Sequence, residues 1–379
     1  MKSFTLLAML LVASLALVLA TPHLQGTKRF SLEAAKNSNS KPDFVREWVA
    51  AHQKWGKPVS QETLAAFSLL DDVSWVQSTD TVYRVTTEGP WAPQYKPNAS
   101  KTSHRVRDAE WEVEYVDGTH ADGIVYLDTV RLGDFELKNT AIESAQVVAP
   151  RFERETGLTG IMGLAKTLPS NVDPPTPSLL DKLRPLLDKA VFTVDLRRNA
   201  TGRFDFGYVD ESKAKDKISW MATRKDSPHW DVTFDMAAWT GSRRVWMAHT
   251  FEATVDTGTT LLFLPPALAG LYWNDVPNMR VDPRLGDAFT FPCEFADELP
   301  DLMLKVPGTE HVLKVPGRYL SYSPTDGDPD YCWGGMQSSE DLGGVSIMGD
   351  VALKALYVAF DLEKNKVGFA NKELDDIDN

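Results

Sequence analysis

Short runs in which apolar and polar residues alternate fill the chain from about residue 75 onward. Gly, Asp and Asn separate these runs, and this combination predicts antiparallel β-strands joined by tight turns. The predicted strands lie at TVYRVTT (81–87), WEVEYVDG (111–118), GIVYLDTVRLGDFEL (123–137), VFTVDL (191–196), RFDFGYVD (203–210), WDVTF (230–234), RRVWMAHTFEATVD (243–256) and KVGFA (366–370). In this part of the chain, helical patterns are limited to 178–189, which Pro185 interrupts, and to a short turn after Pro265. The pattern therefore predicts a mostly β protein.

Length and charge narrow the class of protein. A chain of 379 residues is long enough for two domains, each with its own core. The 53 acidic and 40 basic residues give a net charge of −13. Because no long basic run is present, we expect no nucleic-acid partner.

The first 20 residues, MKSFTLLAMLLVASLALVLA, have the features of a secretory signal peptide. Lys2 precedes an apolar run, and Val18-Leu19-Ala20 offers a cleavage site before Thr21. A membrane anchor is the alternative, but the apolar run is short for a spanning helix. We therefore predict secretion and no membrane association once the signal is removed; vacuolar delivery begins with the same kind of signal.

A basic stretch follows the signal, and DFVREWVAAHQKW within it has helical spacing of Phe44, Trp48 and Val49, with Trp55 further on. Such a leader can shield an acidic surface by charge complementarity, or it can be a solvated arm. Its basic residues are Lys28, Arg29, Lys36, Lys41, Arg46, Lys54 and Lys57.

Secretion also changes the interpretation of the cysteines and of two tripeptides. Cys293 and Cys332 most simply form one disulfide in an oxidising compartment; two buried free thiols are the alternative. Asn98-Ala99-Ser100 and Asn199-Ala200-Thr201 are predicted N-glycosylation sites if they are exposed.

The candidate chemistry lies at Val255-Asp256-Thr257-Gly258-Thr259-Thr260. An apolar strand brings Asp256 into a tight turn, where Gly258 lets the backbone approach closely and the hydroxyls of Thr257 and Thr259 can fix the loop. Facing a second carboxylate, Asp256 would share a proton with it, one group acting as base on a water and the other as acid. An ordinary turn aspartate is the competing interpretation, because Asp-Thr-Gly is a short pattern.

One internal echo accompanies this motif. Ile161-Met162-Gly163 resembles Ile347-Met348-Gly349, 186 positions further on. By itself such a short match is weak support for a duplication.

Taken together, these segments resemble the pepsin family (peptidase family A1) of aspartic proteases, nearest the secreted fungal penicillopepsin and aspergillopepsin type. The resemblance covers most of 75–371, including WEVEYVDGTHADGIVYLDTV, GIMGLA, VDTGTTLLFLP and SIMGDVALKALYVAFDLEKNKVGFA. It implies a mostly β, bilobal fold with one catalytic Asp from each lobe, and a removable prosegment. On this basis we expect a signal peptide at 1–20, a prosegment at 21–70, a truncated N-terminal lobe at 71–210 and a C-terminal lobe at 211–379.

The resemblance also assigns roles to single residues. Asp256 matches the second catalytic aspartate, and Thr257, Gly258 and Thr259 match substrate-binding positions around it. Tyr115, Asp117 and Gly118 match the hairpin flap that closes over substrate, although Val116 stands where Gly is usual. Cys293 and Cys332 match the disulfide of the C-terminal lobe.

The first catalytic aspartate is not found. Phe263 stands seven residues after Asp256, and Trp75 matches Phe263, so the equivalent slot falls near Ser68 in Ser68-Leu69-Leu70. Three explanations are a lost or mispredicted exon, an inactive homologue with a peptide-binding cleft, or replacement by Asp71, Asp72 or Asp80.

The sequence therefore predicts an aspartic-type endopeptidase by family, acting on proteins and peptides at acid pH as a monomer, with little or no activity in this polypeptide. We expect no cofactor and no metal, because the seven histidines form no cluster with ligand spacing. A secreted protein that binds peptides on a catalytically dead protease scaffold is the rival from another class.

Overall fold

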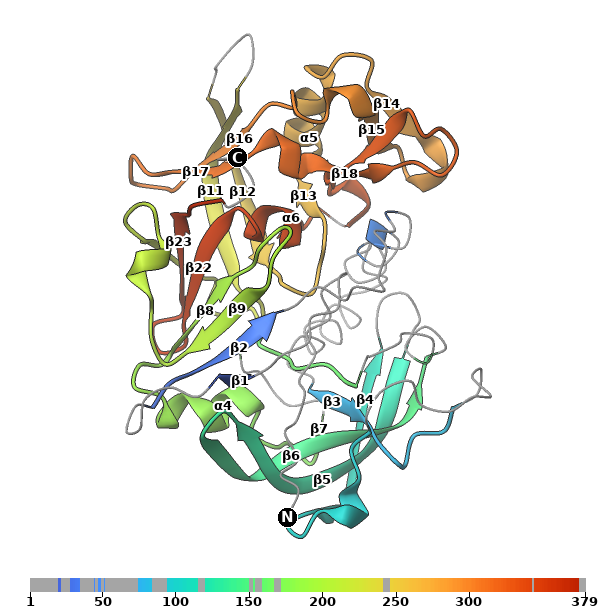
Figure 1. Ribbon diagram of the computed structural model, residues 1–379, viewed down its shortest axis with the longest axis vertical. Helices are drawn as coiled ribbons and strands as arrows, with labels where there is room; N and C mark the ends of the chain where they lie inside the picture. The colour runs from blue at the N-terminus through green and yellow to red at the C-terminus, as the bar shows by residue number, and fades with distance from the viewer. Residues whose placement is uncertain are drawn as a thin grey trace.

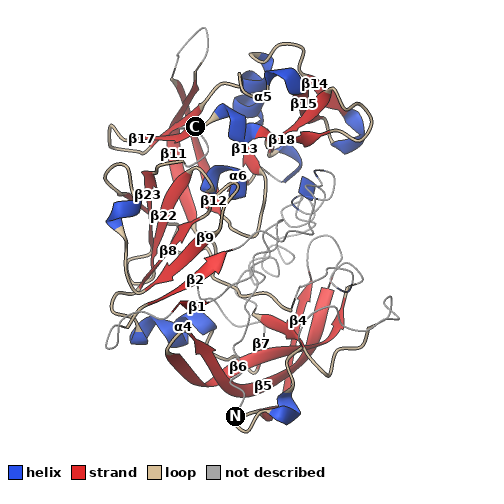
Figure 2. Ribbon diagram, in the orientation of Figure 1, coloured by secondary structure: helices blue, strands red, loops and turns tan. Residues whose placement is uncertain are grey.

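Strands dominate the architecture, as the alternating pattern predicts (Figures 1 and 2). The computed structural model describes residues 20–21, 28–34, 44, 47–48, 51, 74–83, 94–114, 120–149, 153, 159–166, 172–240, 246–342 and 344–374. Within these residues, no helix is long and apolar enough to cross a membrane. The signal peptide other than Ala20 falls outside the described residues.

The first half of the chain forms a five-stranded sheet of order β3-β6-β5-β4-β7, at the bottom of Figure 1. Its longest strands make a twisted antiparallel meander, which the run at 123–137 predicts with a turn at Gly133-Asp134. The strands are β3 (Trp75–Gln77), β4 (His104–Glu114), β5 (His120–Leu132), β6 (Phe135–Val148) and β7 (Val172–Asp173).

The predicted strand at 81–87 is wrong over its first three residues. Residues 81–83 are not in a strand, because the chain turns at Thr79-Asp80 directly after the isolated bridge of Ser78. The Thr81 hydroxyl holds this turn by donating to the carbonyl of Ala145 (2.6 Å) and accepting from the Ser78 amide (2.9 Å). Residues 84–87 lie outside the described part of the chain.

A seven-stranded sheet of order β1-β2-β9-β8-β22-β23-β10 joins three distant parts of the sequence. The predicted lobe boundary at residue 210 falls between strands that share this sheet, since β8 pairs with β22. Its strands are β1 (Ala20–Thr21), β2 (Phe30–Ala34), β8 (Val191–Asp195), β9 (Gly202–Phe206), β10 (Ser219–Ala222), β22 (Leu356–Asp361) and β23 (Lys366–Asn371).

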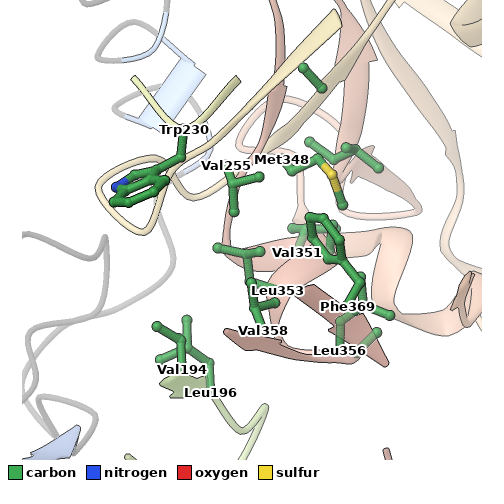
Figure 3. Packing of buried hydrophobic residues seen from close by; sticks show 14 of the residues in the cluster. Val194, Leu196, Trp230, Val255, Met348, Val351, Leu353, Leu356, Val358 and Phe369 are labelled. Atoms are coloured by element: carbon green, nitrogen blue, oxygen red, sulfur yellow. The ribbon is translucent and has the colours of Figure 1, made fainter. Parts of the chain in front are cut away.

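A second seven-stranded sheet, of order β17-β16-β11-β12-β21-β13-β20, carries the candidate site. Side chains from β8, β12, β21, β22 and β23 meet in one apolar cluster between the two seven-stranded sheets, where Val194, Val255, Met348, Val358 and Phe369 are buried (Figure 3). The strands are β11 (Asp231–Trp239), β12 (Met247–Val255), β13 (Leu262–Leu264), β16 (Leu302–Lys305), β17 (Val312–Val315), β20 (Met336–Ser338) and β21 (Ser346–Met348).

A four-stranded sheet of order β14-β15-β19-β18 lies at the top of Figure 1, beside α5. Both predicted helical segments are confirmed: 178–189 contains α4, which ends before a 3₁₀ turn containing Pro185, and α5 follows Pro265. The elements are β14 (Arg280–Asp282), β15 (Ala288–Pro292), β18 (Ser321–Pro324), β19 (Tyr331–Gly334), α4 (Leu179–Leu183), α5 (Pro266–Asn274) and α6 (Asp350–Leu353).

Candidate active site

Asp256 follows the last residue of β12, at the centre of the second seven-stranded sheet. There β12 lies antiparallel to β11 and parallel to β21, with Val255 opposite Met348. The Asp256 amide donates to the Met348 carbonyl (3.1 Å), which extends the ladder by one residue. Ala253, Thr254 and Val255 directly before it are all buried, and the aspartate emerges where the strand ends.

The turn after Asp256 holds its carboxylate by local hydrogen bonds. The Gly258 amide donates to Oδ1 (2.8 Å) and the Thr259 hydroxyl donates to Oδ2 (2.5 Å). Thr259 is buried, whereas Asp256 and Thr257 are half-buried and Gly258 is exposed. Donors to both oxygens fix the orientation of the carboxylate while leaving it accessible to solvent. That the Thr257 hydroxyl helps to fix the loop stays a prediction.

The backbone at and directly after Ile347-Met348-Gly349, the second copy of the internal echo, packs against this turn. The Asp350 amide donates to the Thr259 carbonyl (2.8 Å), and the Val351 amide donates to the Thr260 carbonyl (2.9 Å). A Cβ at Gly349 would lie 2.3 Å from the Leu261 carbonyl oxygen and 2.4 Å from that of Thr259. Only glycine fits there, because the turn after Asp256 packs directly on this backbone.

Asp350 is a buried carboxyl that the sequence analysis missed. Its side chain is fully buried, and burial raises its pKa to about 7; nearby Lys354 opposes this, while Asp256 and Glu47 add to it. Lys354 Nζ lies 3.3 Å from Oδ2, yet neither oxygen accepts a well-aligned hydrogen bond from the described residues. The available signal was its place directly after the echo, where the first copy has Leu164.

The first half of the chain repeats part of this arrangement. In the second half Phe263 of β13 lies opposite Ile347, beside Gln337 of the parallel strand β20. In the first half Val76 faces Gly160, which puts Trp75 opposite Ile161, and Trp75 also lies beside Glu143 of the parallel strand β6. Trp75 and Phe263 thus occupy equivalent places, in agreement with the echo and with the equivalence inferred from the sequence.

The slot seven residues before Trp75, near Ser68, lies outside the described residues, as do Asp71 and Asp72. Asp80, the remaining candidate to replace the missing aspartate, accepts hydrogen bonds from Tyr126 (3.1 Å) and from Ser144 (3.3 Å). Both partners belong to the five-stranded sheet, so this carboxylate is engaged within the first half of the chain.

Other predicted site residues vary in how far the structure places them. Tyr115, Asp117 and Gly118 lie outside the described residues, but the flanking strands β4 and β5 pair up to Glu114 and His120. Cys293 and Cys332 are joined as a disulfide. Asn98 and Asn199 are both exposed. Among the described residues, no group of three or more His, Cys, Asp or Glu side chains is placed to hold a metal ion.

Comparison with known proteins identifies the class. Residues 72–372 match the family described as eukaryotic aspartyl protease. The chain therefore belongs to the pepsin family of aspartic-type endopeptidases, whose substrates are proteins and peptides.

Particular relatives are fungal. The chain is 34% identical to aspartic protease pepA of Arthroderma otae over 286 residues, 73% of this chain and 71% of the relative. It is 32% identical to endothiapepsin of Cryphonectria parasitica over 305 residues, 79% of this chain and 69% of the relative. Podosporapepsin of Podospora anserina is 33% identical over 282 residues, 74% of this chain and 64% of the relative. The chain thus spans about two thirds of the length of these proteins.

Proposed function

We propose that Asp256 is a catalytic carboxylate of a secreted aspartic-type endopeptidase, and that this polypeptide hydrolyses peptide bonds little or not at all. The observation that carries the first part is the Asp256 turn, which holds a half-buried carboxylate by donors to both oxygens. The second part rests on the slot near Ser68, where the sequence has no Asp-Thr-Gly.

The complete reaction needs two carboxyl groups that share one proton. The ionised group removes a proton from a water molecule, which attacks the peptide carbonyl carbon. The protonated group donates its proton toward the carbonyl oxygen, and the group that took the proton from water then donates it to the leaving amine. Asp256 alone can take one of these roles but not both, so the exchange of a proton across the site is lost.

Several finer assignments accompany this proposal. Residues 1–20 direct the chain into the secretory pathway, residues 21–70 are a prosegment, and the enzyme is a monomer delivered to the medium or the vacuole. Tyr115, Asp117 and Gly118 close over the substrate as a flap, and Thr257 and Thr259 line its binding site together with Gly258. Asn98 and Asn199 carry N-linked glycans.

Acid-pH cleavage of a denatured protein, with and without pepstatin, tests the proposal. We expect no pepstatin-sensitive cleavage by this polypeptide, and activity when a segment with Phe-Asp-Thr-Gly-Ser and its leading strand is inserted before Trp75. Asp256→Asn should abolish the restored activity. Pepstatin-sensitive cleavage by the unaltered polypeptide would overturn the second part, and activity of the restored Asp256→Asn variant would overturn the first.

Genomic sequence upstream of the codon for Trp75 separates the protease from the rival peptide-binding protein. An uninterrupted reading frame between splice sites that encodes Phe-Asp-Thr-Gly-Ser or a similar sequence supports the protease. Its absence, together with pepstatin binding but no cleavage, favours the peptide-binding protein.

A further inference from the structure

A cavity of about 690 Å³ lies on the first seven-stranded sheet, and none of its lining residues belongs to the Asp256 turn. Its walls come from the start of β8, the loop before β10 and the turn between β22 and β23. Strands β8, β22 and β23 are neighbours in that sheet (Figure 1), whereas Asp256 follows β12 in the other one. Sites for small organic ligands have volumes of about 300–1,000 Å³, so the cavity has the size of a ligand site.

The indole of Trp220 forms an aromatic wall of this cavity. Trp220 lies on the edge strand β10, opposite Gly368 of β23, and is 40% exposed. A Cβ at Gly368 would lie 2.9 Å from Trp220 Cδ2 and 2.7 Å from Cγ2 of Ile218. The ring therefore packs directly on bare backbone beside Ile218, a close approach that glycine permits. This packing holds the ring in place while part of its surface stays open to the cavity.

Charged side chains of both signs line the same cavity. Asp188, Glu211 and Glu363 supply carboxylates, and Lys189 and Lys217 supply ammonium groups. All five residues are exposed. Among the described residues, none of these five side chains has a hydrogen-bond or ion-pair partner. The cavity therefore offers free acceptors and free donors around the aromatic wall.

This combination favours a neutral polar ligand. The lysines would repel a cation, and the carboxylates would repel an anion. A hydroxyl group both donates and accepts hydrogen bonds, so a sugar can use the two kinds of side chain together. The C–H groups on one face of a pyranose ring carry partial positive charge, and the face of an indole is negative. An exposed indole bordered by free donors and acceptors thus matches the chemistry of a sugar.

We propose that this cavity is a carbohydrate-binding site, in which a chain of two or three pyranose units stacks on Trp220 and its hydroxyl groups bind Glu211 and Glu363. The ligand is either the glycan of a glycoprotein or a segment of a polysaccharide, since both present the same chemistry. Bound sugar would hold the protein on a glycosylated target without taking part in peptide hydrolysis. The site is therefore independent of the reaction proposed for Asp256.

Calorimetric titration of the full chain with cellotriose, chitotriose and mannotriose tests this proposal without measuring peptidase activity. We expect at least one of them to bind with a Kd of about 1 mM or lower. Trp220→Ala should weaken that binding at least about tenfold, and Glu211→Ala combined with Glu363→Ala about fivefold. Trp246→Ala is the matched control, because Trp246 is 36% exposed but does not line the cavity, and it should bind as the parent does.

Thermal unfolding of each variant checks that it is folded, and equal midpoints are expected because the replaced side chains are exposed. Two further assays distinguish the sources of the sugar. Co-sedimentation with insoluble cellulose or chitin indicates a polysaccharide, whereas retention on an immobilised high-mannose glycoprotein, lost once its glycan is removed, indicates a protein-linked glycan. No saturable binding of any trisaccharide up to about 20 mM, or equal affinity of the parent and Trp220→Ala, would overturn the proposal.

Discussion

Replacing Asp350 by asparagine should change how stability depends on pH, because this carboxyl is buried beneath the Asp256 turn. Its pKa is raised from 3.8 to about 7 by burial. A group whose pKa is higher in the folded state binds its proton more tightly there, so stability is lost as the pH rises from about 4 to 7. A shift from 3.8 to about 7 corresponds to a loss of about 3 kcal/mol between those two pH values.

Asparagine has nearly the same shape and carries no charge, so Asp350→Asn should remove this loss. The variant should be as stable as the parent near pH 4 and more stable at pH 7 by about 3 kcal/mol. In thermal unfolding, each kcal/mol corresponds to about 2–4 °C in melting temperature. The assay is thermal unfolding of both proteins across pH 4–8. Asp361→Asn is a control, because Asp361 is half-buried at the end of β22. Parallel pH profiles for Asp350→Asn and the parent would refute the reasoning.

Three further outcomes are expected. Replacing Cys293 and Cys332 by alanine opens a loop of separation 39 and should destabilise the protein by about 4 kcal/mol, seen as a lower midpoint of urea unfolding; an unchanged midpoint argues against a stabilising crosslink. Lys372→Met should lower the free energy of unfolding by about 3–5 kcal/mol, because buried Lys372 donates to Asp195 (2.9 Å) and holds the Asp195 pKa low against the effect of burial. This loss of stability should vanish as acid protonates Asp195, and a loss unchanged by acid contradicts the ion-pair role. Asn98→Gln and Asn199→Gln should each remove one glycan from the secreted protein, measured by intact mass before and after deglycosylation, and an unchanged mass would show that the site is not used.

Much of the fold was predictable because its rules are local. Alternation with a turn at Gly133-Asp134 predicts the β5–β6 hairpin, and Pro185 marks where α4 gives way to a 3₁₀ turn. The same reasoning wrongly predicted a strand at 81–83, because the Thr81 hydroxyl holds a turn there. Strand β2 was missed because its partner β9 lies about 170 residues away, with Phe30 opposite Phe206. No local pattern encodes such a pairing.

The same distinction between local and distant features applies to the residues of the site. Asp256 could be predicted because its motif is contiguous and ends an apolar strand. Asp350 and Glu47 could not be, because their importance comes from burial and from neighbours distant in sequence. Trp75 lies between these cases: its equivalence to Phe263 was inferred by counting positions, and the strand registers of the two halves agree with that count.

A well-formed Asp256 turn does not by itself imply that the chain can carry out the complete reaction. Gly258, Thr259, Met348 and Asp350, all from the second half of the chain, make hydrogen bonds within or to this turn. A polypeptide without the first Asp-Thr-Gly can therefore make these hydrogen bonds and still lack the second carboxyl group that peptide hydrolysis requires. A well-formed turn at Asp256 is thus a sign of family membership, whereas catalytic activity has to be judged from the first half of the chain.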